Sequence, residues 1–204
     1  MLSHAQDKPV IQWKPWQIIL VFAVLQFLLT GLGIFMDQSC IGFSFIYGFS
    51  FFNALIVVLP ILLIRRFGVG AAVYLPYALI GMVIDYEMEW VVDPLLTSPW
   101  WAVVFGLFGL AVGFSADLAF RFLPAHITLK YRSILTAITL GLVNFLTTAV
   151  GVSFFYKPDA FPISPAYSFL KIAWWALPWL IASCGLAGFT AWAMVQERLQ
   201  KWGK

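Results

Sequence analysis

Acidic and aromatic side chains are concentrated in one short segment of the chain, where they could bind a cation. Within nine residues the segment contains Asp85, Glu87, Glu89, Trp90 and Asp93. If a helix continues through it, Asp85, Glu89 and Asp93 lie on one face, where like charges repel by about 0.2–0.5 kcal/mol per pair. A cationic ligand, a metal ion, or a lysine of the chain such as Lys157 or Lys171 would relieve this repulsion.

Tryptophans near the acids give a second reason to expect an organic cation. Trp90, Trp100 and Trp101 lie close together in sequence, and an aromatic ring attracts a cation over its face by roughly 0.5–2 kcal/mol. The alternative is a solvated acidic loop with tryptophans in the interfacial belt of a membrane. We take the segment as the candidate ligand-binding site and add to it Asn144, one of the few polar residues in the long apolar runs.

A second constellation is a stripe of small and charged residues. Gly109, Gly113, Asp117 and Arg121 follow one another at four-residue steps, so they share one face of a helix. The pair Gly109-x-x-x-Gly113 lets another helix approach closely, and the spacing predicts an ion pair between Asp117 and Arg121. The alternative for the charged pair is a contact with a cytoplasmic or membrane partner.

The last apolar run has a comparable row of small residues, Ser183, Ala187 and Ala191. Small side chains at this spacing are typical of faces on which membrane helices associate. The candidate partner-interface residues are therefore Gly109, Gly113, Asp117, Arg121 and Ala187.

Composition predicts the elements that must position these residues. Of the 204 residues, 62% are hydrophobic and 10% are charged, whereas a soluble domain has about 25% charged residues. A soluble domain of this length could not bury so much apolar surface, so lipid must cover part of it. We predict an all-α fold: a polytopic membrane helix bundle that forms a single transmembrane domain over residues 1–204.

Six apolar runs are long enough to cross a hydrocarbon layer about 30 Å thick, which takes roughly 20 residues of helix. Their predicted limits are residues 16–36, 40–64, 67–85, 100–122, 132–156 and 166–196. Pro15, Pro99 and Pro165 stand immediately before three of them. Proline suits the start of a helix, where its missing N–H would have no partner anyway.

Basic residues set the direction of the spans. With the N-terminus inside, ten of the twelve Lys and Arg residues fall on the cytoplasmic side, and six of the nine Asp and Glu residues fall outside. This asymmetry follows the positive-inside rule. It predicts six transmembrane helices with both the N- and C-termini cytoplasmic, and an acidic segment on the outer face. We expect an integral membrane protein of a prokaryotic cell (inner) membrane.

Several function classes are not supported by the sequence. The net charge is only +3 and the basic residues are scattered, so no nucleic-acid partner is expected. Two cysteines without C-x-x-C spacing and two histidines give no reason to expect a metal site or a cofactor. The sequence has no nucleophile elbow, zinc-protease helix or phosphate-binding glycine loop, and we expect no enzyme activity.

The order of these features resembles the substrate-binding S component of energy-coupling factor (ECF) vitamin transporters. Residues 67–74 are similar to the glycine- and alanine-rich start of the family's third helix, residues 106–117 to the fourth helix of its thiamine-related branch, and residues 184–189 to its small-residue final helix. The first helix lacks the family's usual Ala-x-x-x-Ala face for the coupling subunit and instead has bulky residues at Phe22, Leu25 and Phe27.

This resemblance implies the ligand-binding membrane subunit of a vitamin or precursor importer, with a small solute bound near the outer face. The acidic segment favours a cationic solute, such as thiamine or its pyrimidine part. Uptake would then need a multi-subunit complex with a membrane coupling subunit and ATPases. Two alternatives remain: a non-catalytic accessory subunit of a larger membrane complex, and a lipid-processing membrane enzyme with a polar cleft around Arg65, Arg66, Asp117 and Arg121.

Overall fold

The computed structural model describes residues 13–36, 44–81, 101–124, 126–155 and 165–202, and over these ranges the protein is all-helical. The helices are α1 (Pro15–Met36), α2 (Ser44–Ile64), α3 (Val69–Pro76), α5 (Trp101–Phe122), α6 (Leu129–Phe155) and α7 (Pro165–Trp202). A short π-helix, η2 (Tyr77–Gly81), continues α3. The predicted all-α class is confirmed over these ranges. Each predicted apolar run overlaps a helix, and the run 67–85 overlaps α3 and η2.

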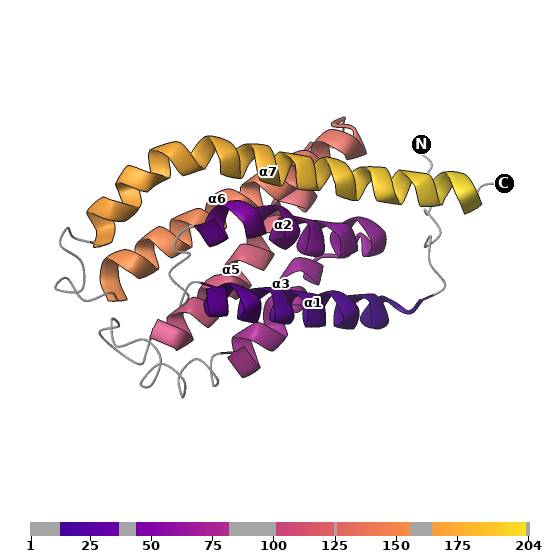
Figure 1. Ribbon diagram of the computed structural model, residues 1–204. Helices are drawn as coiled ribbons and strands as arrows, with labels where there is room; N and C mark the ends of the chain where they lie inside the picture. Colours follow the sequence, from indigo (N-terminus) through magenta and orange to yellow (C-terminus); the bar gives the residue numbers. More distant parts are fainter. Residues whose placement is uncertain (1–12, 37–43, 82–100, 125, 156–164, 203–204) are drawn as a thin grey trace.

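Proline explains where two of these helices begin and where one changes form. Pro15 and Pro165 are the first residues of α1 and α7, as expected for a residue without an N–H. Pro76 ends α3 directly before η2. Its ring cannot supply an α-helical hydrogen bond and crowds the preceding turn, which gives a physical reason for the wider turn that follows. By contrast, α7 continues through Pro178 as one curved helix (Figure 1).

The helices form one bundle in which α2 occupies a central position (Figure 1). α2 contacts α1, α3, α6 and α7, while α6 and α7 share the most extensive interface. Val57, Ile61, Leu140 and Leu180 are almost completely buried in the core between them. α1 begins and α7 ends at the same end of the bundle.

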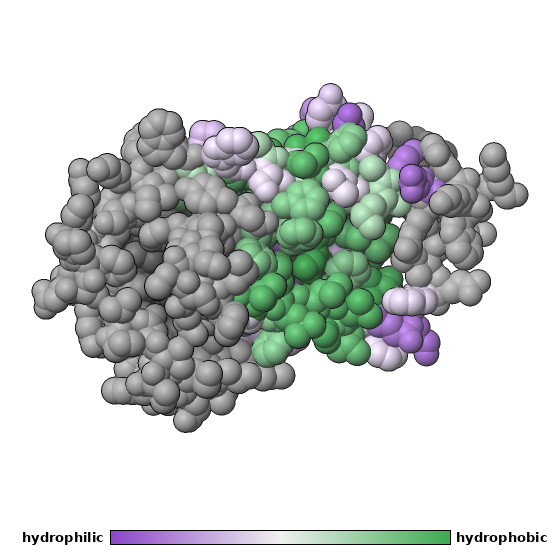
Figure 2. Space-filling model, viewed as in Figure 1, coloured by the Kyte–Doolittle hydropathy of each residue, from purple (hydrophilic) through white to green (hydrophobic). Residues whose placement is uncertain are grey.

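The outside of the bundle is apolar as well. Large hydrophobic side chains are exposed on every helix, and those on α1 are Trp16, Leu20, Val21, Val24, Leu25, Leu28 and Leu32. In the coloured part of Figure 2 the surface is continuously apolar, and the most hydrophilic of the coloured residues lie toward the end where α1 begins. Soluble monomers rarely expose apolar patches of this extent, so this surface requires lipid or another apolar covering.

Two helices are long and apolar enough to cross a membrane, through the stretches Pro15–Leu32 in α1 and Ala176–Glu197 in α7. The apolar stretches Phe49–Ile64 and Val69–Leu79 are shorter among the residues whose placement is described. The two long stretches support a membrane protein. The six-span topology stays a prediction.

Candidate functional site: a basic pocket at one end of the bundle

A tight turn between α2 and α3 places two arginines side by side. Arg65 ends α2 in the left-handed region, with φ of 54°, and its N–H donates to the carbonyl of Ile61 at 2.8 Å. This is the αL helix cap that glycine usually makes. Gly68, with φ of 90°, then leads into α3, and glycine adopts this conformation without steric cost. The turn therefore presents Arg65 and Arg66 at the end of the bundle.

The buried carboxylate of Asp117 holds the start of α3. Gly68 is the N-cap residue of α3 and has no side chain to accept from the first N–H groups, which lack partners within the helix. Asp117 of α5, only 2% exposed, accepts from the N–H of Gly70 at 3.0 Å and of Ala71 at 3.1 Å. The helix dipole also favours a negative charge at this position. Asp117 is thus an N-cap supplied by a different helix.

The ion pair predicted between Asp117 and Arg121 is not formed, so that prediction is wrong. Each carboxylate oxygen accepts from an N–H of α3, and the Arg121 guanidinium lies over the Phe67 ring, 5.9 Å from its centroid. The spacing correctly placed both charges toward one end of a helix. It could not show that the uncapped start of α3 competes for the carboxylate.

The glycine stripe of α5 packs against α3 of the same chain. Gly113 and Gly70 lie so close that a Cβ on either residue would collide with the carbonyl oxygen of the other. A Cβ on Gly109 would meet the ring of Tyr74 at 3.3 Å. The close helix approach predicted from Gly109-x-x-x-Gly113 is confirmed, but the approaching helix belongs to the protein itself.

The small-residue row of α7 is internal too. Ala187 is fully buried, and its neighbour Gly188 lies against the backbone of Ser133 and Ile134 in α6. The Ser133 hydroxyl donates to the Gly188 carbonyl at 2.7 Å. Packing within the bundle thus involves Gly109, Gly113, Asp117 and Ala187. Their assignment to a partner interface stays a prediction. Arg121, the fifth residue of that set, is exposed.

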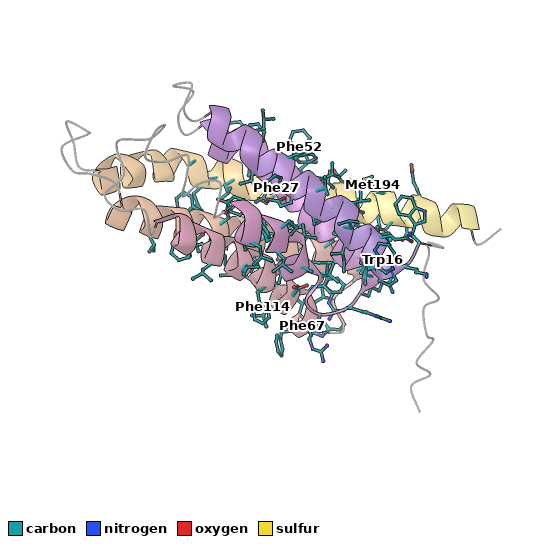
Figure 3. The ribbon with its side chains drawn as sticks, turned by 90° about the horizontal axis from the view of Figure 1, so that it is seen from below. Trp16, Phe27, Phe52, Phe67, Phe114 and Met194 are labelled. Carbon is teal, nitrogen blue, oxygen red and sulfur yellow. The ribbon has the colours of Figure 1, made fainter. Side chains whose placement is uncertain are left out.

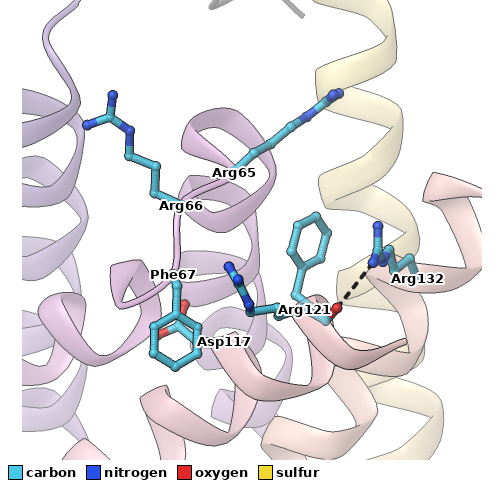
Figure 4. A pocket seen from close by; sticks show the side chains of 7 residues that line it. Arg65, Arg66, Phe67, Asp117, Arg121 and Arg132 are labelled. Carbon is cyan, nitrogen blue, oxygen red and sulfur yellow. Dashed lines mark hydrogen bonds between the residues drawn. The ribbon is translucent and has the colours of Figure 1, made fainter. Parts of the chain in front are cut away.

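Four arginines line a shallow pocket of about 150 Å³ at this end of the bundle. Its lining residues are Arg65, Arg66, Phe67, Asp117, Phe120, Arg121 and Arg132 (Figure 4). Arg65 and Arg66 point in different directions, away from each other, in Figure 4. The pocket therefore has a wide basic rim and does not form a closed cage around one point.

Arg132 of α6 joins the pocket to the end of α5. One of its terminal nitrogens donates to the carbonyls of Leu123 at 2.9 Å and Arg121 at 3.5 Å, where a helix leaves carbonyl groups without partners. The guanidinium also lies 5.0 Å from the centroid of the Phe120 ring. Its Nε is buried without an acceptor in the described part of the chain, so one polar group of the pocket lining has no partner there.

The pocket can bind an anion, but its groups do not suit acid–base chemistry. Asp117 is committed to α3, and guanidinium groups do not lose a proton in proteins. The cleft that a lipid-processing enzyme would need around Arg65, Arg66, Asp117 and Arg121 is present. Its geometry supports binding of a negative group and offers no free base.

Most of the predicted ligand-binding set lies outside the described residues. This holds for Asp85, Glu87, Glu89, Trp90, Asp93 and Trp100, and also for the side chain of Trp101, whose backbone starts α5. Asn144 is half-buried in α6, and its backbone carbonyl accepts from the Thr147 hydroxyl at 2.9 Å. The assignment of these residues to a ligand site stays a prediction.

Arg65, Arg66 and Arg121 are predicted from the sequence as residues of a polar cleft, whereas Phe67, Gly70 and Arg132 are not. One signal was available for Gly70. The run Phe67-Gly68-Val69 offers no capping side chain to the following helix, so an acceptor had to come from elsewhere. Asp117 is the only acid more than one turn inside a predicted span, which makes it the natural source.

The fold and the site together define an all-helical bundle with an apolar outer surface and an arginine-lined pocket at one end. No protein-family model matches the chain, and comparisons with curated proteins and with solved structures give no match. The function must therefore be inferred from the contacts themselves.

Proposed function

We propose that the chain is an integral membrane protein with six spans and both termini in the cytoplasm, and that it is the ligand-binding subunit of an importer for a small cationic solute. The proposal is supported by the way in which α3 and α5 are connected. α3 and α5 are fastened together at the basic end by Asp117 and by the contact of Gly70 with Gly113. The acidic segment belongs to residues 82–100, which join their opposite ends.

Helix lengths and charge support the membrane placement. α5 has 22 residues, which corresponds to about 33 Å at 1.5 Å per residue, and α6 and α7 are longer. The basic side chains described near this end of the helices are Lys14, Arg65, Arg66, Arg121, Lys130 and Arg132. By the positive-inside rule this end faces the cytoplasm, so the acidic segment faces outward.

A ligand site benefits from a rigid scaffold beneath it, because fixed elements reduce the ordering required on binding. The hydroxyl of Tyr74 donates to the side-chain oxygen of Asn53 at 2.6 Å, which ties α3 to α2 just before η2. π-helical turns are rare and occur frequently at functional sites. Here such a turn leads directly into the chain that carries Asp85 and Glu89.

The importer proposal agrees with two features of the chain: the sequence has no phosphate-binding glycine loop, and its small-residue helix faces are packed inside the bundle. The resemblance to ECF S components concerns a protein that binds solute and leaves ATP hydrolysis to others, and this sequence has no phosphate-binding glycine loop. The accessory-subunit alternative relied on small-residue faces open to a partner. Those faces are packed inside the bundle at Gly113 and Ala187.

The direct test is solute binding by the purified protein, with thiamine as the probe. We expect the Glu89→Gln substitution to raise the Kd for thiamine by roughly tenfold, through loss of one charge partner of the cation. The matched control is Glu197→Gln, which removes an acid at the other end of the bundle and should leave the Kd unchanged. Equal affinities for wild type and Glu89→Gln would remove this residue from the site.

A second experiment separates an importer from an accessory subunit. The protein is purified by an affinity tag from its native host in mild detergent, and the retained proteins are identified by mass spectrometry. Recovery of a membrane coupling subunit with paired ATPases is the expected result. Recovery of a large redox or enzymatic complex would overturn the importer proposal.

A further inference from the structure

We propose that the basic pocket binds the phosphate of an anionic phospholipid, whose acyl chains lie along the exposed apolar face of α5. The inference rests on the membrane placement proposed above, and it is independent of the importer role. It concerns the end of the bundle opposite to the acidic segment, and four observations support it.

The first observation is an excess of positive charge. Four of the seven lining residues are arginines, and Asp117 is the only acid among them. The Asp117 carboxylate is buried and already accepts from two backbone N–H groups. The lining therefore carries a net positive charge, which an anion with several oxygen atoms would offset.

The second observation is that guanidinium donors are available. Arg66 is exposed and has no hydrogen bond or ion pair within the described ranges. Arg121 contacts the face of Phe67, which leaves its N–H groups open. The Nε of Arg132 is buried without an acceptor in the same part of the chain. Planar guanidinium donors match the oxygen geometry of phosphate.

The third observation is size. The pocket measures about 150 Å³, whereas sites that enclose a small molecule measure about 300–1,000 Å³. A phosphate group fits within this volume, and a larger ligand would extend beyond the shallow pocket. The rest of the ligand must therefore lie outside the pocket, against the surface of the bundle.

The fourth observation is the surface beside the pocket. Phe67 is 46% exposed and Phe114 is 43% exposed, and their rings pack edge to face with centroids 5.2 Å apart. Figure 3 shows both rings at the outer edge of the bundle. Leu107 lies two turns before Phe114 in α5 and is also exposed. The two residues share nearly the same helix face, because seven residues make about two turns.

α5 thus presents Arg121, Phe114 and Leu107 in succession, from its charged end into its N-terminal half. A phospholipid has the same order of groups, with a charged phosphate followed by a hydrocarbon chain. Basic pockets at the cytoplasmic ends of membrane helices bind anionic headgroups in this way. A free phosphate would use the arginines and gain nothing from the apolar residues.

Native mass spectrometry of the full chain in neutral detergent micelles tests the proposal. Phosphatidylglycerol and phosphatidylcholine of matched acyl chains are titrated separately, and the fraction with one bound lipid is measured. We expect a preference for phosphatidylglycerol. This preference should fall by about fivefold in Arg66→Gln and further in the double variant Arg66→Gln/Arg121→Gln, since one arginine near an anionic lipid contributes a factor of about five.

The charge-matched control is Lys14→Gln/Lys130→Gln, which removes two basic residues that do not line the pocket. It should retain the lipid preference within about twofold. Arg66→Gln has no hydrogen bond, ion pair or ring contact to lose in the described chain, so its result does not depend on whether the double variant folds. Equal binding of the two lipids by wild type, or equal losses in pocket and control variants, would overturn the proposal.

A competition experiment shows whether the bound phosphate belongs to a lipid or to a free anion. Glycerol phosphate, which carries the charge without acyl chains, should not displace bound phosphatidylglycerol at equal concentration. Displacement would show that the pocket recognises a free anion and would overturn the lipid assignment. Because the thiamine experiment concerns Glu89 at the other end, failure of either proposal can be distinguished from failure of the other.

Discussion

Two helix pairs in this bundle are joined in different ways. The contact between α3 and α5 depends on a helix of eight residues, one buried carboxylate and one pair of facing glycines. The contact between α6 and α7 joins helices of 27 and 38 residues. It is distributed over small side chains such as Ala137 and Ala187, each completely buried.

The difference shows where a single group can control the fold. In a distributed contact each side chain contributes a small part, and a neighbour can adjust when one is changed. In the α3–α5 contact two N–H groups depend on one residue, Asp117. Asp117 also lines the basic pocket, so the stability of this contact bears on the pocket as well.

The largest effect is expected for Asp117→Ala. The substitution removes the acceptor of the Gly70 and Ala71 N–H groups, and each buried N–H without a partner costs about 1–3 kcal/mol. We expect a loss of about 4 kcal/mol of stability in total, measured by unfolding of the purified protein in mixed micelles. Asp117→Asn keeps one acceptor and should lose about half as much. Equal stability of Asp117→Ala and wild type would show that α3 needs no cap.

A smaller loss is expected for Gly113→Ala. Its Cβ would collide with the carbonyl of Gly70 and approach the Tyr74 ring at 2.8 Å. Because backbone atoms cannot move aside as a side chain can, we expect a loss of about 2–3 kcal/mol. The matched control is Gly109→Ala on the same helix, which meets only tyrosine rings at 3.3 Å and beyond. If both substitutions have the same effect, the α3–α5 contact is looser than described.

At the α6–α7 contact, two glycine-to-alanine substitutions are expected to change the stability in opposite directions. In Gly188→Ala the Cβ would lie 2.6 Å from the Ser133 carbonyl oxygen, and we expect a loss of about 2 kcal/mol. In Gly185→Ala the nearest atom is 3.7 Å away, so the higher helix propensity of alanine should add up to about 0.8 kcal/mol. Thermal unfolding of the two variants, compared with wild type, should show shifts in opposite directions. Shifts of the same sign would contradict the packing of α7.

The smallest effect is expected for Tyr74→Phe. It removes the hydrogen bond to Asn53, and side-chain hydrogen bonds between membrane helices contribute about 0.6 kcal/mol on average. The measurement is the same unfolding experiment, combined with Asn53→Ala in a double-mutant cycle. A coupling energy near zero would show that this bond does not tie α3 to α2.

The sequence predicts the helices well because the signals are local. Apolar runs and proline at Pro15 and Pro165 determine where helices lie and begin. The stripe Gly109-x-x-x-Gly113 also correctly indicates a close helix contact. In each case the pattern needs only the residues of one segment.

The candidate site is less predictable because its contacts join distant segments. Asp117 and Gly70 are far apart in sequence, and the i+4 pairing of Asp117 with Arg121 is the simpler local expectation. Nothing within α5 indicates that the end of another helix lacks a cap. Likewise, Arg132 reaches the pocket only because the turn after Phe122 folds α6 back beside α5.

In the proposed orientation the basic pocket faces the cytoplasm and the acidic segment faces outward. Cysteine labelling tests it directly, in a background with Cys40→Ser in which the remaining native Cys184 is buried. Arg66→Cys and Glu89→Cys are treated in intact cells with a maleimide that cannot cross the membrane. We expect labelling of Glu89→Cys in intact cells, and labelling of Arg66→Cys only after the membrane is permeabilised. Labelling of Arg66→Cys in intact cells would contradict the orientation and both proposals that depend on it.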